Sequence, residues 1–337
     1  MKTYHIEQYG SPDGLILRSH DDPVAGPNQV VVRVRANSLN FRDLMILQGK
    51  FRTSPRPGLI PLSDGAGEVI AAGAAVTRVK VGDRVAGAFH QRWIAGRIAQ
   101  EFMGSDLGGG IDGMLTEHAL LDEEGLVRIP AHLSFEEAAT LPCAAVTAWA
   151  ALTGTTPVTA GETVVTQGSG GVSVFALQFA KLLGARVIAT TSSGEKAMRL
   201  KGLGADEVIN YNETPDWDQA VNALTGGRGA ELVVEVGGSS TLAKSIRSVG
   251  LGGQVVLIGV VGGAGPNLDP QGLRGRGVVL RSVTVGNRRS FEAMNRAIDV
   301  HRMRPLIDRV FSFDEAKEAY RYMESRKHFG KIVISGA

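Results

Sequence analysis

Cysteine and long hydrophobic runs are scarce in this chain of 337 residues. Cys143 is the only cysteine, which excludes a disulfide within the chain and any zinc site built from several cysteines. No stretch approaches the roughly 18 consecutive apolar residues of a membrane-spanning helix, so none is expected. Residues 1–7 are typical of a strand that contains a glutamate rather than of a secretory signal peptide. These absences favour a protein of the reducing cytoplasm.

The chain also lacks an excess of charge of one sign. Its formal net charge is +2, and Lys and Arg are spread along the sequence, which indicates neither a nucleic-acid-binding surface nor a basic patch for membranes. Glycine, by contrast, is abundant, with 44 residues. Glycine permits tight turns and close approaches of the backbone, which β-rich and nucleotide-binding folds need. The length itself predicts two domains.

The first 125 or so residues predict a compact, mostly antiparallel β domain. Short alternating runs of hydrophobic residues are bounded there by Gly, Asp or Pro, and they cover residues 29–34, 68–72, 84–88 and 115–121. A helix is then expected to begin at Ser134, because Ser134 and Glu137 have the spacing of a capping box.

From Thr163 the pattern changes to alternating strands and helices. The predicted strands are 163–167, 186–190, 207–210, 231–236, 254–260 and 278–285, and the helices between them are 172–183, 195–203, 216–224 and 239–249. The strands are continuous apolar runs, as in parallel sheets that are covered on both faces. The expected fold class is therefore α/β with a doubly wound, six-stranded parallel sheet. The remaining elements (helix 290–301, strand 307–311, helix 313–323, strand 331–334) are too few for a domain and are expected to return to the β domain.

A glycine motif marks the end of the first parallel strand. Gly168-x-Gly170-x-x-Ser173 follows strand 163–167 directly and opens an apolar helix, as in dinucleotide-binding folds. Gly168 permits the tight turn and Gly170 lets the backbone approach a pyrophosphate, while Gly171 and Val172 begin the helix whose N–H groups would bind it. Ser173 replaces the usual third glycine. A glycine-rich turn without a ligand is the alternative, which the position on the first strand of the sheet disfavours.

The end of the second strand predicts the choice of cofactor. An NAD site usually has Asp or Glu there to bind the ribose hydroxyls. Here residues 190–193 are hydroxyl-bearing, and Ser192 is followed by Lys196. These groups suit a 2′-phosphate, to which Tyr211 after the third strand would add a phenol. The expected cofactor is therefore NADPH, although Lys196 alone is also consistent with an exposed residue in the first turn of a helix.

Together these patterns resemble the medium-chain dehydrogenase/reductase superfamily, closest to its zinc-free quinone-oxidoreductase and enoyl-reductase-like branch. The resemblance runs nearly from end to end and includes residues 36–43, 65–69, 81–85, 141–143, the Gly168 turn, 204–206 with 209–211, and 328–331. It implies a GroES-like catalytic domain (1–128 and 288–337) and a Rossmann NADP-binding domain (129–287), with the cofactor between them. It also implies a homodimer formed through the edge of the cofactor domain's sheet, for which strand 278–285 is the candidate edge.

The resemblance further implies that no zinc is bound. Zinc-dependent relatives have a Cys, a His-Glu pair and a second Cys at the positions that hold Asn40, Ser63-Asp64 and Cys143 here. Zinc needs about three protein ligands plus an open position, and only Cys143 is a plausible ligand. Without a His nearby in sequence, Cys143 itself is expected to be a buried helix residue rather than a nucleophile.

The residues near the nicotinamide are assigned by the same resemblance. They are Asn40, Thr147, the loop with Gly259 and Val260, and the loop with Val285 and Asn287. Asn40 is the candidate catalytic residue, with a turn residue of the β domain as the alternative. Arg42 and Asp43 lie close to it and are also consistent with a structural ion pair. Residues 88–113, with three consecutive glycines at 108–110, are the stretch expected to face the substrate.

The expected activity is the transfer of hydride from NADPH to a quinone or to an α,β-unsaturated carbonyl compound. In both reactions negative charge ends on an oxygen, which hydrogen-bond donors such as Asn40 and the ribose hydroxyls stabilise without a metal. A zinc-free alcohol dehydrogenase or aldehyde reductase is one alternative. A dinucleotide-binding structural or regulatory protein without turnover is another. No nucleic acid or membrane partner is expected.

Overall fold

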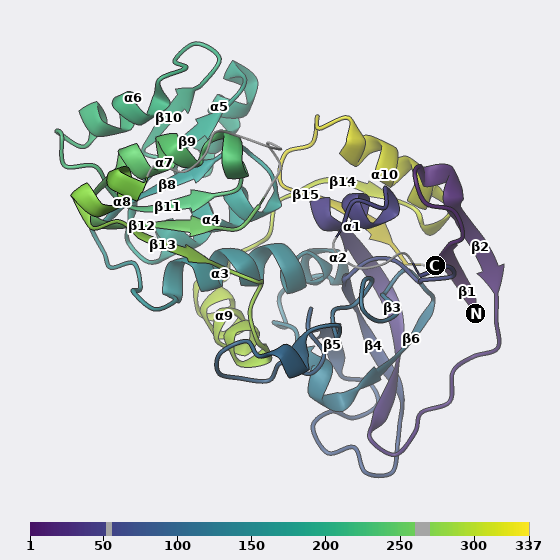
Figure 1. Cartoon of the computed structure of the whole chain (residues 1–337). Helices are drawn as coiled ribbons and strands as arrows, with labels where there is room; N and C mark the ends of the chain where they lie inside the picture. The colour runs from purple at the N-terminus through teal and green to yellow at the C-terminus, as the bar shows by residue number, and fades with distance from the viewer. Residues whose placement is uncertain (52–55, 260–269, 337) are drawn as a thin grey trace. The chain divides into compact units, whose positions relative to one another are not determined.

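The computed structural model describes residues 1–51, 56–259 and 270–336. The chain forms two compact units, one made of residues 1–146 with 286–337 and the other of residues 147–285. Each unit has its own sheet and its own hydrophobic core (Figure 1). The catalytic domain expected from the sequence (1–128 and 288–337) and the NADP-binding domain (129–287) remain a prediction. In the part of the chain that the structure describes, no helix has the length and apolar character needed to cross a membrane.

The first unit is built on a seven-stranded sheet with the strand order β14-β15-β3-β4-β5-β7, to which β6 is added by pairing with β3. The strands are β3 (Gln29–Leu39), β4 (Asp64–Ala72), β5 (Arg84–Gly87), β6 (His118–Asp122), β7 (Leu126–Arg128), β14 (Ile307–Phe311) and β15 (Lys331–Ser335). Every pair is antiparallel except β14 with β15. A hairpin of β1 (Lys2–Ile6) and β2 (Leu15–Ser19) is separate. Because β15 pairs with β3, the C-terminal tail completes the β domain, as predicted.

Four helices belong to this unit: α1 (Phe41–Leu47), α2 (Phe135–Ala139), α9 (Arg288–His301) and α10 (Ala316–Glu324). The predicted capping box is confirmed at α2, where the Ser134 N–H donates to Oε2 of Glu137 at 2.8 Å and the Glu137 N–H donates to Oγ of Ser134 at 3.2 Å. A π-helical segment, Leu141–Ala145, leads from α2 into α3 (Val146–Thr153). The core of the unit includes Tyr320 of α10, which is fully buried against residues of β1, β15 and α1.

The second unit confirms the predicted doubly wound sheet. Its six strands are all parallel and have the order β10-β9-β8-β11-β12-β13. They are β8 (Thr163–Gln167), β9 (Arg186–Thr191), β10 (Glu207–Asn210), β11 (Ala230–Glu235), β12 (Val249–Leu257) and β13 (Val279–Ser282). The helices α4 (Gly171–Leu182), α5 (Gly194–Gly202), α6 (Trp217–Leu224), α7 (Leu242–Ser248) and α8 (Pro270–Arg276) connect them. Val164 and Val165 are both fully buried, as expected for strands covered on both faces.

Several boundaries in this unit differ from the prediction, and the largest difference is at the start of β12. β12 begins at Val249, five residues before the predicted start at Gln254, and β13 ends at Ser282 rather than at Val285. The sequence did not indicate this early start because Gly250, Gly252 and Gly253 of β12 are typical of a turn. A Cβ on Gly250 would lie 2.4 Å from the carbonyl oxygen of Arg228, so this stretch needs glycine to pair closely with β11.

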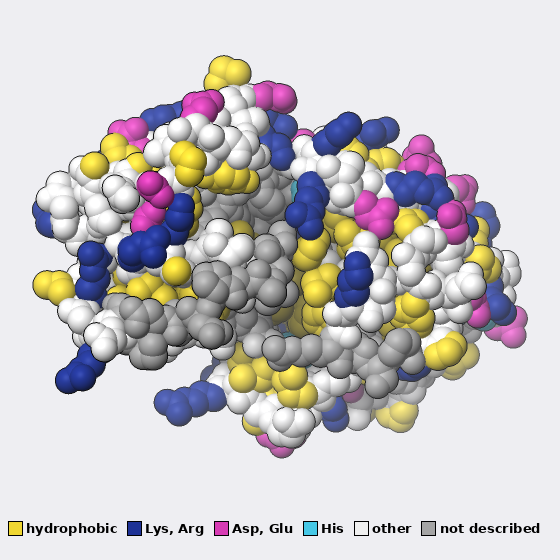
Figure 2. Space-filling model, turned by 45° about the horizontal axis from the view of Figure 1, so that its top comes forward, with side chains coloured by type: hydrophobic (Ala, Val, Ile, Leu, Met, Phe, Trp, Pro, Cys, Tyr) yellow, Lys and Arg dark blue, Asp and Glu magenta, His cyan; other side chains and the backbone are white. Residues whose placement is uncertain are grey.

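Charged side chains are mixed over the face of the molecule that Figure 2 shows, with Lys and Arg interspersed among Asp and Glu. This distribution agrees with the small net charge of +2.

Candidate cofactor site and candidate active site

The turn between β8 and α4 has the geometry of a phosphate-binding loop. Gly168 has a φ of +72°, which glycine adopts without strain, and Gly170 is the extended N-cap residue of α4. A Cβ at either glycine would meet no heavy atom of the described chain within 4 Å. Gly170 has no side chain to accept the first N–H groups of α4, which begins at Gly171 and Val172. The turn therefore fits a pyrophosphate group, which would accept these hydrogen bonds and lie at the positive end of a 12-residue helix.

Ser173 takes the place of the usual third glycine, and the structure explains how it is accommodated. Its side chain is buried, and its hydroxyl donates a hydrogen bond of 2.5 Å to the carbonyl oxygen of Gln167. The serine therefore ties the first turn of α4 to the last residue of β8. Close packing between helix and strand is kept by a short hydrogen bond rather than by the absence of a side chain.

The three residues predicted to bind a 2′-phosphate follow neighbouring strands of the parallel sheet. Ser192 comes after β9, Lys196 lies in the first turn of α5, and Tyr211 comes after β10 with 38% of its surface exposed. Backbone contacts hold the two turns together, since the Tyr211 N–H donates to the carbonyl of Thr191 at 2.9 Å. Because β9 and β10 pair in register, the ends of these strands lie at the same edge of the sheet.

A buried carboxylate at the same edge was not predicted. Glu235, the last residue of β11, is fully buried, and its Oε1 accepts hydrogen bonds from the Gly237 and Gly238 N–H groups at 2.7 and 2.9 Å. Its Oε2 accepts from Nε2 of Gln167 at 2.9 Å and from the Ser245 hydroxyl. The network joins the end of β8, directly before Gly168, to the turn after β11. A glutamate within an otherwise apolar run, 231–236, was the signal available in the sequence.

The other residues that were predicted to lie near the nicotinamide are divided between the two units. Thr147 is buried in α3, and Gly259 follows β12, whereas Val260 lies outside the described residues. Val285 has a φ of +55°, which is uncommon for a β-branched residue. Asn287 caps α9 by accepting from the Ser290 N–H at 2.9 Å. Thr147, Gly259 and Val285 belong to the second unit and Asn287 to the first.

In the first unit, Asn40 is part of a buried polar cluster that we call the Lys331 cluster (Asn40, Ser63, Asp64 and Lys331). The Lys331 ammonium group donates to Oδ1 of Asn40 and to the carbonyl of Leu39, both at 2.7 Å, and lies 3.4 Å from Oδ2 of Asp64. The Ser63 hydroxyl donates to Oδ1 of Asp64 at 3.1 Å. Burial raises the pKa of the Asp64 carboxyl, while the positive charge of Lys331 opposes that rise. The contribution of Lys331 was not predicted.

A second group of charges lies beside this cluster. The Arg42 guanidinium pairs with Oδ2 of Asp106 at 2.6 Å and lies 3.6 Å from Oδ1 of Asp43, so the ion pair considered for Arg42 and Asp43 extends to a third residue. Burial raises the pKa of Asp43 to about 6, against the lowering effect of Arg42. Burial also lowers the pKa of His90 to about 4. His90 is therefore neutral at pH 7, and neither of its ring nitrogens has a partner among the described residues.

The positions at which zinc-dependent relatives bind their metal hold a poor set of zinc ligands. In the Lys331 cluster Asn40 and Ser63 are neutral, and Asp64 already interacts with a lysine. Burial and the nearby carboxylate of Asp64 raise the pKa of the Cys143 thiol, which disfavours the thiolate that zinc requires. Across the described parts of the chain, no three His, Cys, Asp or Glu side chains form a group that could hold a metal ion.

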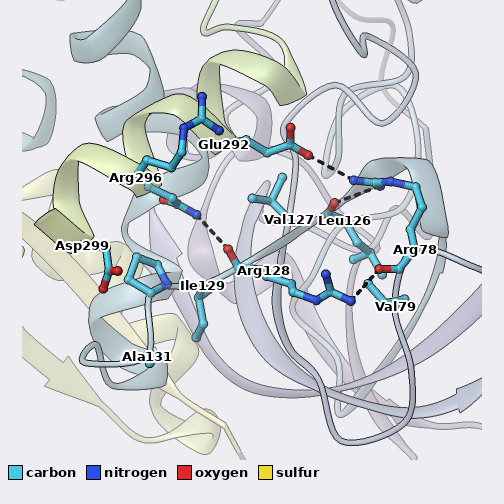
Figure 3. Close-up of a pocket in the computed structure, with 12 residues that line it drawn as sticks. Arg78, Val79, Leu126, Val127, Arg128, Ile129, Ala131, Glu292, Arg296 and Asp299 are labelled. Carbon is cyan, nitrogen blue, oxygen red and sulfur yellow. Dashed lines mark hydrogen bonds and ion pairs between the residues drawn. The ribbon is translucent and has the colours of Figure 1, made fainter.

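A surface pocket of about 430 Å³ lies elsewhere in the first unit, between β7 and α9 (Figure 3). Arg78, Arg128 and Arg296 line it together with Glu292 and Asp299. Two of these arginines are paired, Arg78 with Glu292 at 3.1 Å and Arg128 with Asp83 at 3.0 Å. No member of the Lys331 cluster lines this pocket, so it is separate from the candidate active site.

A Rossmann-type parallel sheet with a glycine turn after its strand β8, in a chain that also has a β unit with a buried polar cluster, is the architecture of two-domain oxidoreductases. Comparison with known families agrees. Residues 26–131 match the alcohol dehydrogenase GroES-like domain, and residues 171–299 match the family described as zinc-binding dehydrogenase. The chain belongs to the medium-chain dehydrogenase/reductase superfamily.

Individual relatives cover nearly the whole chain. A zinc-type alcohol dehydrogenase-like protein of Schizosaccharomyces pombe is 41% identical over 91% of both chains. A quinone oxidoreductase of Pseudomonas aeruginosa is 33% identical over 99% of both chains. A 2-methylene-furan-3-one reductase of Solanum lycopersicum is 32% identical over 99% of this chain and 79% of its own.

Two solved structures show the same fold with different cofactors in their names. The structure of an NAD-dependent alcohol dehydrogenase superposes with a TM-score of 0.91, at 32% identity and with both chains fully covered. A mycobacterial protein in complex with NADPH superposes with a TM-score of 0.82, at 27% identity over 99% of each chain. The similarity therefore shows an oxidoreductase fold whose relatives use nicotinamide dinucleotides of either kind.

Proposed function

We propose that this protein is a zinc-independent, NADPH-dependent oxidoreductase that transfers hydride to a quinone or to an α,β-unsaturated carbonyl compound. The observation that carries the proposal is the Lys331 cluster. Its Asn40 amide and Ser63 hydroxyl stand at positions where the family resemblance places metal ligands of zinc-dependent relatives, and the Lys331 ammonium group contacts Asn40. Relatives named quinone oxidoreductase and 2-methylene-furan-3-one reductase support the class of substrate.

The residues of the chain suit a reaction in which charge develops on oxygen. When bound, NADPH supplies the hydride. Asn40 is proposed to donate a hydrogen bond from Nδ2 to the carbonyl or quinone oxygen of the substrate, where the negative charge collects. The buried Lys331 ammonium group donates to the side-chain oxygen of Asn40, at the opposite end of the amide from Nδ2. Neutral aldehydes and alcohols lack the conjugated system over which this charge spreads, and zinc-dependent relatives use a Lewis acid instead.

The preference for NADPH is supported by the edge of the second unit's sheet. Ser192, Lys196 and Tyr211 follow β9 and β10, and no acidic residue ends β9. The Gly168 turn fits the pyrophosphate that both cofactors share, so the preference depends on these three residues. The single cysteine, Cys143, supports a reducing cytoplasm, and the edge strand β13 supports a homodimer.

The decisive experiment measures the oxidation of NADPH by metal-stripped protein with quinones, enals, enones and aldehydes, in the presence of chelator. We expect turnover with quinones or enones and less than stoichiometric zinc by elemental analysis. About one tightly held zinc per chain, with activity lost when it is removed, would overturn the proposal. Steady oxidation of alcohols in chelator would identify a zinc-free alcohol dehydrogenase, and NADPH binding without turnover would identify a regulatory protein.

A further inference from the structure

We propose that Lys331 is a positioning residue that fixes the side-chain amide of Asn40 in one orientation, so that only N–H donors of this amide face the substrate. The inference rests on the proposed function, in which Asn40 stabilises the oxygen of the substrate. It selects substrates that present an unprotonated acceptor oxygen, such as quinones and enones.

The contacts of Lys331 determine which end of the amide faces it. An ammonium group has three N–H donors and no acceptor. These donors are directed at Oδ1 of Asn40 and the carbonyl of Leu39, both at 2.7 Å, and at Oδ2 of Asp64 at 3.4 Å. The side chain of Lys331 is 3% exposed, so water does not compete for these acceptors. The atom of Asn40 that lies against Lys331 must therefore be the amide oxygen, since the NH₂ group would place donors against donors.

The opposite end of the amide supports the same orientation. Nδ2 of Asn40 lies 3.5 Å from Oγ of Ser63, at the limit of a hydrogen bond. The Ser63 hydroxyl gives its own hydrogen to Oδ1 of Asp64 at 3.1 Å, which leaves its oxygen to accept from Asn40. Nδ2 thus faces two acceptors of the cluster, the Ser63 hydroxyl at 3.5 Å and the Asp64 carboxylate, and a substrate oxygen would compete with these contacts for its N–H groups. Because a hydrogen bond from a cation polarises an amide, Lys331 also strengthens the donors on Nδ2.

The fold explains how a residue from the end of the chain reaches this position. Lys331 is the first residue of β15, and the next residue, Ile332, pairs with Leu39 of β3, directly before Asn40. Gly330 precedes it with a φ of +80°, and a Cβ there would lie 2.7 Å from the carbonyl oxygen of Leu306. The glycine therefore allows the sharp entry into β15 that directs Lys331 into the cluster. Gly330 and Lys331 belong to the segment 328–331 that resembles the family, and these contacts give both residues a physical role.

The test is a double-mutant cycle between Lys331 and Asn40. Lys331→Met alone would leave Asp64 as an unpaired buried charge, so the variant to use is Lys331→Met with Asp64→Asn. We expect this variant to lower kcat at least about tenfold and to leave the Kd of NADPH unchanged. Asn40→Ala is expected to lower kcat about 100-fold, the effect of removing one oxyanion-stabilising donor. Adding the Lys331 and Asp64 changes to Asn40→Ala should lower kcat no further, because Lys331 acts through Asn40. Lys327→Met, at an exposed lysine of the same segment, is the matched control and should retain full activity.

A second measurement is independent of activity. In protein labelled with ¹⁵N-asparagine, the side-chain NH₂ signals of Asn40, identified by their loss in Asn40→Ala, should shift when Lys331 and Asp64 are replaced. Unchanged NH₂ signals would overturn the proposal. So would an equal loss of kcat when Lys331 and Asp64 are replaced in wild type and in Asn40→Ala. A shift of these signals in an enzyme for which Asn40→Ala keeps full kcat would support the positioning by Lys331 and overturn the catalytic role of Asn40 in the proposed function.

Discussion

At the scale of single residues, Asn40 shows how two interpretations of one position are compatible. From the sequence it is either a turn residue or a catalytic donor. Its backbone N–H donates to Oδ2 of Asp43 at 2.8 Å and begins α1, whereas its side-chain oxygen accepts from Lys331. The main-chain N–H of Asn40 thus helps to begin α1, while its side-chain amide contacts Lys331 and Ser63 in the buried cluster.

Asp43 makes the stability of the protein dependent on pH. Its pKa is about 6 in the folded protein, above the ordinary value of 3.8. Between pH 4 and 6 the native state therefore binds more protons than the unfolded state, and stability falls as the pH rises. A pKa shift of one unit changes the free energy of unfolding by about 1.4 kcal/mol, so the shift of Asp43 lowers the free energy of unfolding across this window by on the order of 3 kcal/mol. Urea unfolding of wild type and Asp43→Asn at pH 4, 5 and 6 tests this.

From pH 4 to pH 6 the unfolding free energy of wild type should fall relative to that of Asp43→Asn, which cannot lose a proton at this position. Above about pH 7 the difference between the two proteins should stay constant. Asp13→Asn, at an exposed aspartate, is the control and should follow the wild-type curve. Parallel curves for wild type and Asp43→Asn would show that Asp43 titrates normally.

Lys196 is expected to carry much of the preference for NADPH. A hydrogen bond to a charged group contributes about 1.5–3 kcal/mol, and about 1.4 kcal/mol is a factor of ten in affinity. Lys196→Ala should therefore weaken NADPH binding about ten- to a hundredfold and change NADH binding little, as measured by fluorescence titration. Lys201→Ala, on the same helix, is the control because Lys201 contacts Asp206 and Glu207. Equal losses of affinity for NADPH and NADH would show that Lys196 supports the fold rather than binding the 2′-phosphate. A wild-type preference for NADH would contradict the proposed cofactor.

At the scale of elements, the Glu235 network connects β8, β11 and the first residues of α7. Its two carboxylate oxygens accept from backbone N–H groups on one side and from Gln167 and Ser245 on the other. Every strong acceptor site of this buried charge is used, which is the condition under which a buried carboxylate is tolerated. The network restrains the end of β8, where the Gly168 turn begins.

Replacing Glu235 by glutamine is expected to destabilise the protein by about 3 kcal/mol. Whichever way the amide is placed, its NH₂ would face a group that can only donate, either the Gly237 and Gly238 N–H groups or Nε2 of Gln167. Denaturant unfolding measures the loss, with Glu231→Gln as the control. Glu231 is an exposed residue of the same strand whose carboxylate accepts from the Thr163 N–H at 2.7 Å, an interaction that glutamine can keep. A loss below about 1 kcal/mol for Glu235→Gln would show that the network reorganises around an amide.

At the scale of the whole molecule, the strand order leaves β13 at one edge of the second unit's sheet. Val279, its first residue, is 45% exposed. An apolar edge strand invites pairing with another strand. We therefore expect a dimer formed through β13, as the resemblance to this branch of the superfamily implies.

Sedimentation velocity at micromolar concentration should show a dimer for wild type, and Val279→Lys should shift it toward monomer. Val300→Lys, at a residue of α9 that is 77% exposed in the first unit, is the control and should leave the dimer intact. A monomeric wild type would remove the proposal, and a dimer that tolerates Val279→Lys would place the interface elsewhere.

The second unit was largely predictable because its signals are local. Parallel strands buried on both faces appear as continuous apolar runs, and the Gly168 turn requires glycine whatever the rest of the chain does. Strand 163–167 of this unit was located from neighbouring residues alone, as was the Ser134–Glu137 capping box in the first unit, and both agree with the structure. The largest error came where glycine in β12 serves close backbone pairing rather than a turn.

The Lys331 cluster could not be predicted in this way, because Lys331 and Asn40 are 291 residues apart in sequence. The chain by itself determined the alternation of strands and helices, the glycine turn after β8 and the residue types at the positions that the family resemblance assigns to zinc. Only the antiparallel pairing of β15 with β3 decided that an ammonium group lies against the Asn40 amide. The physical reason is that helix caps, turns and apolar runs depend on residues a few positions apart, whereas a buried charge finds its partners through long-range strand pairing that local patterns do not specify.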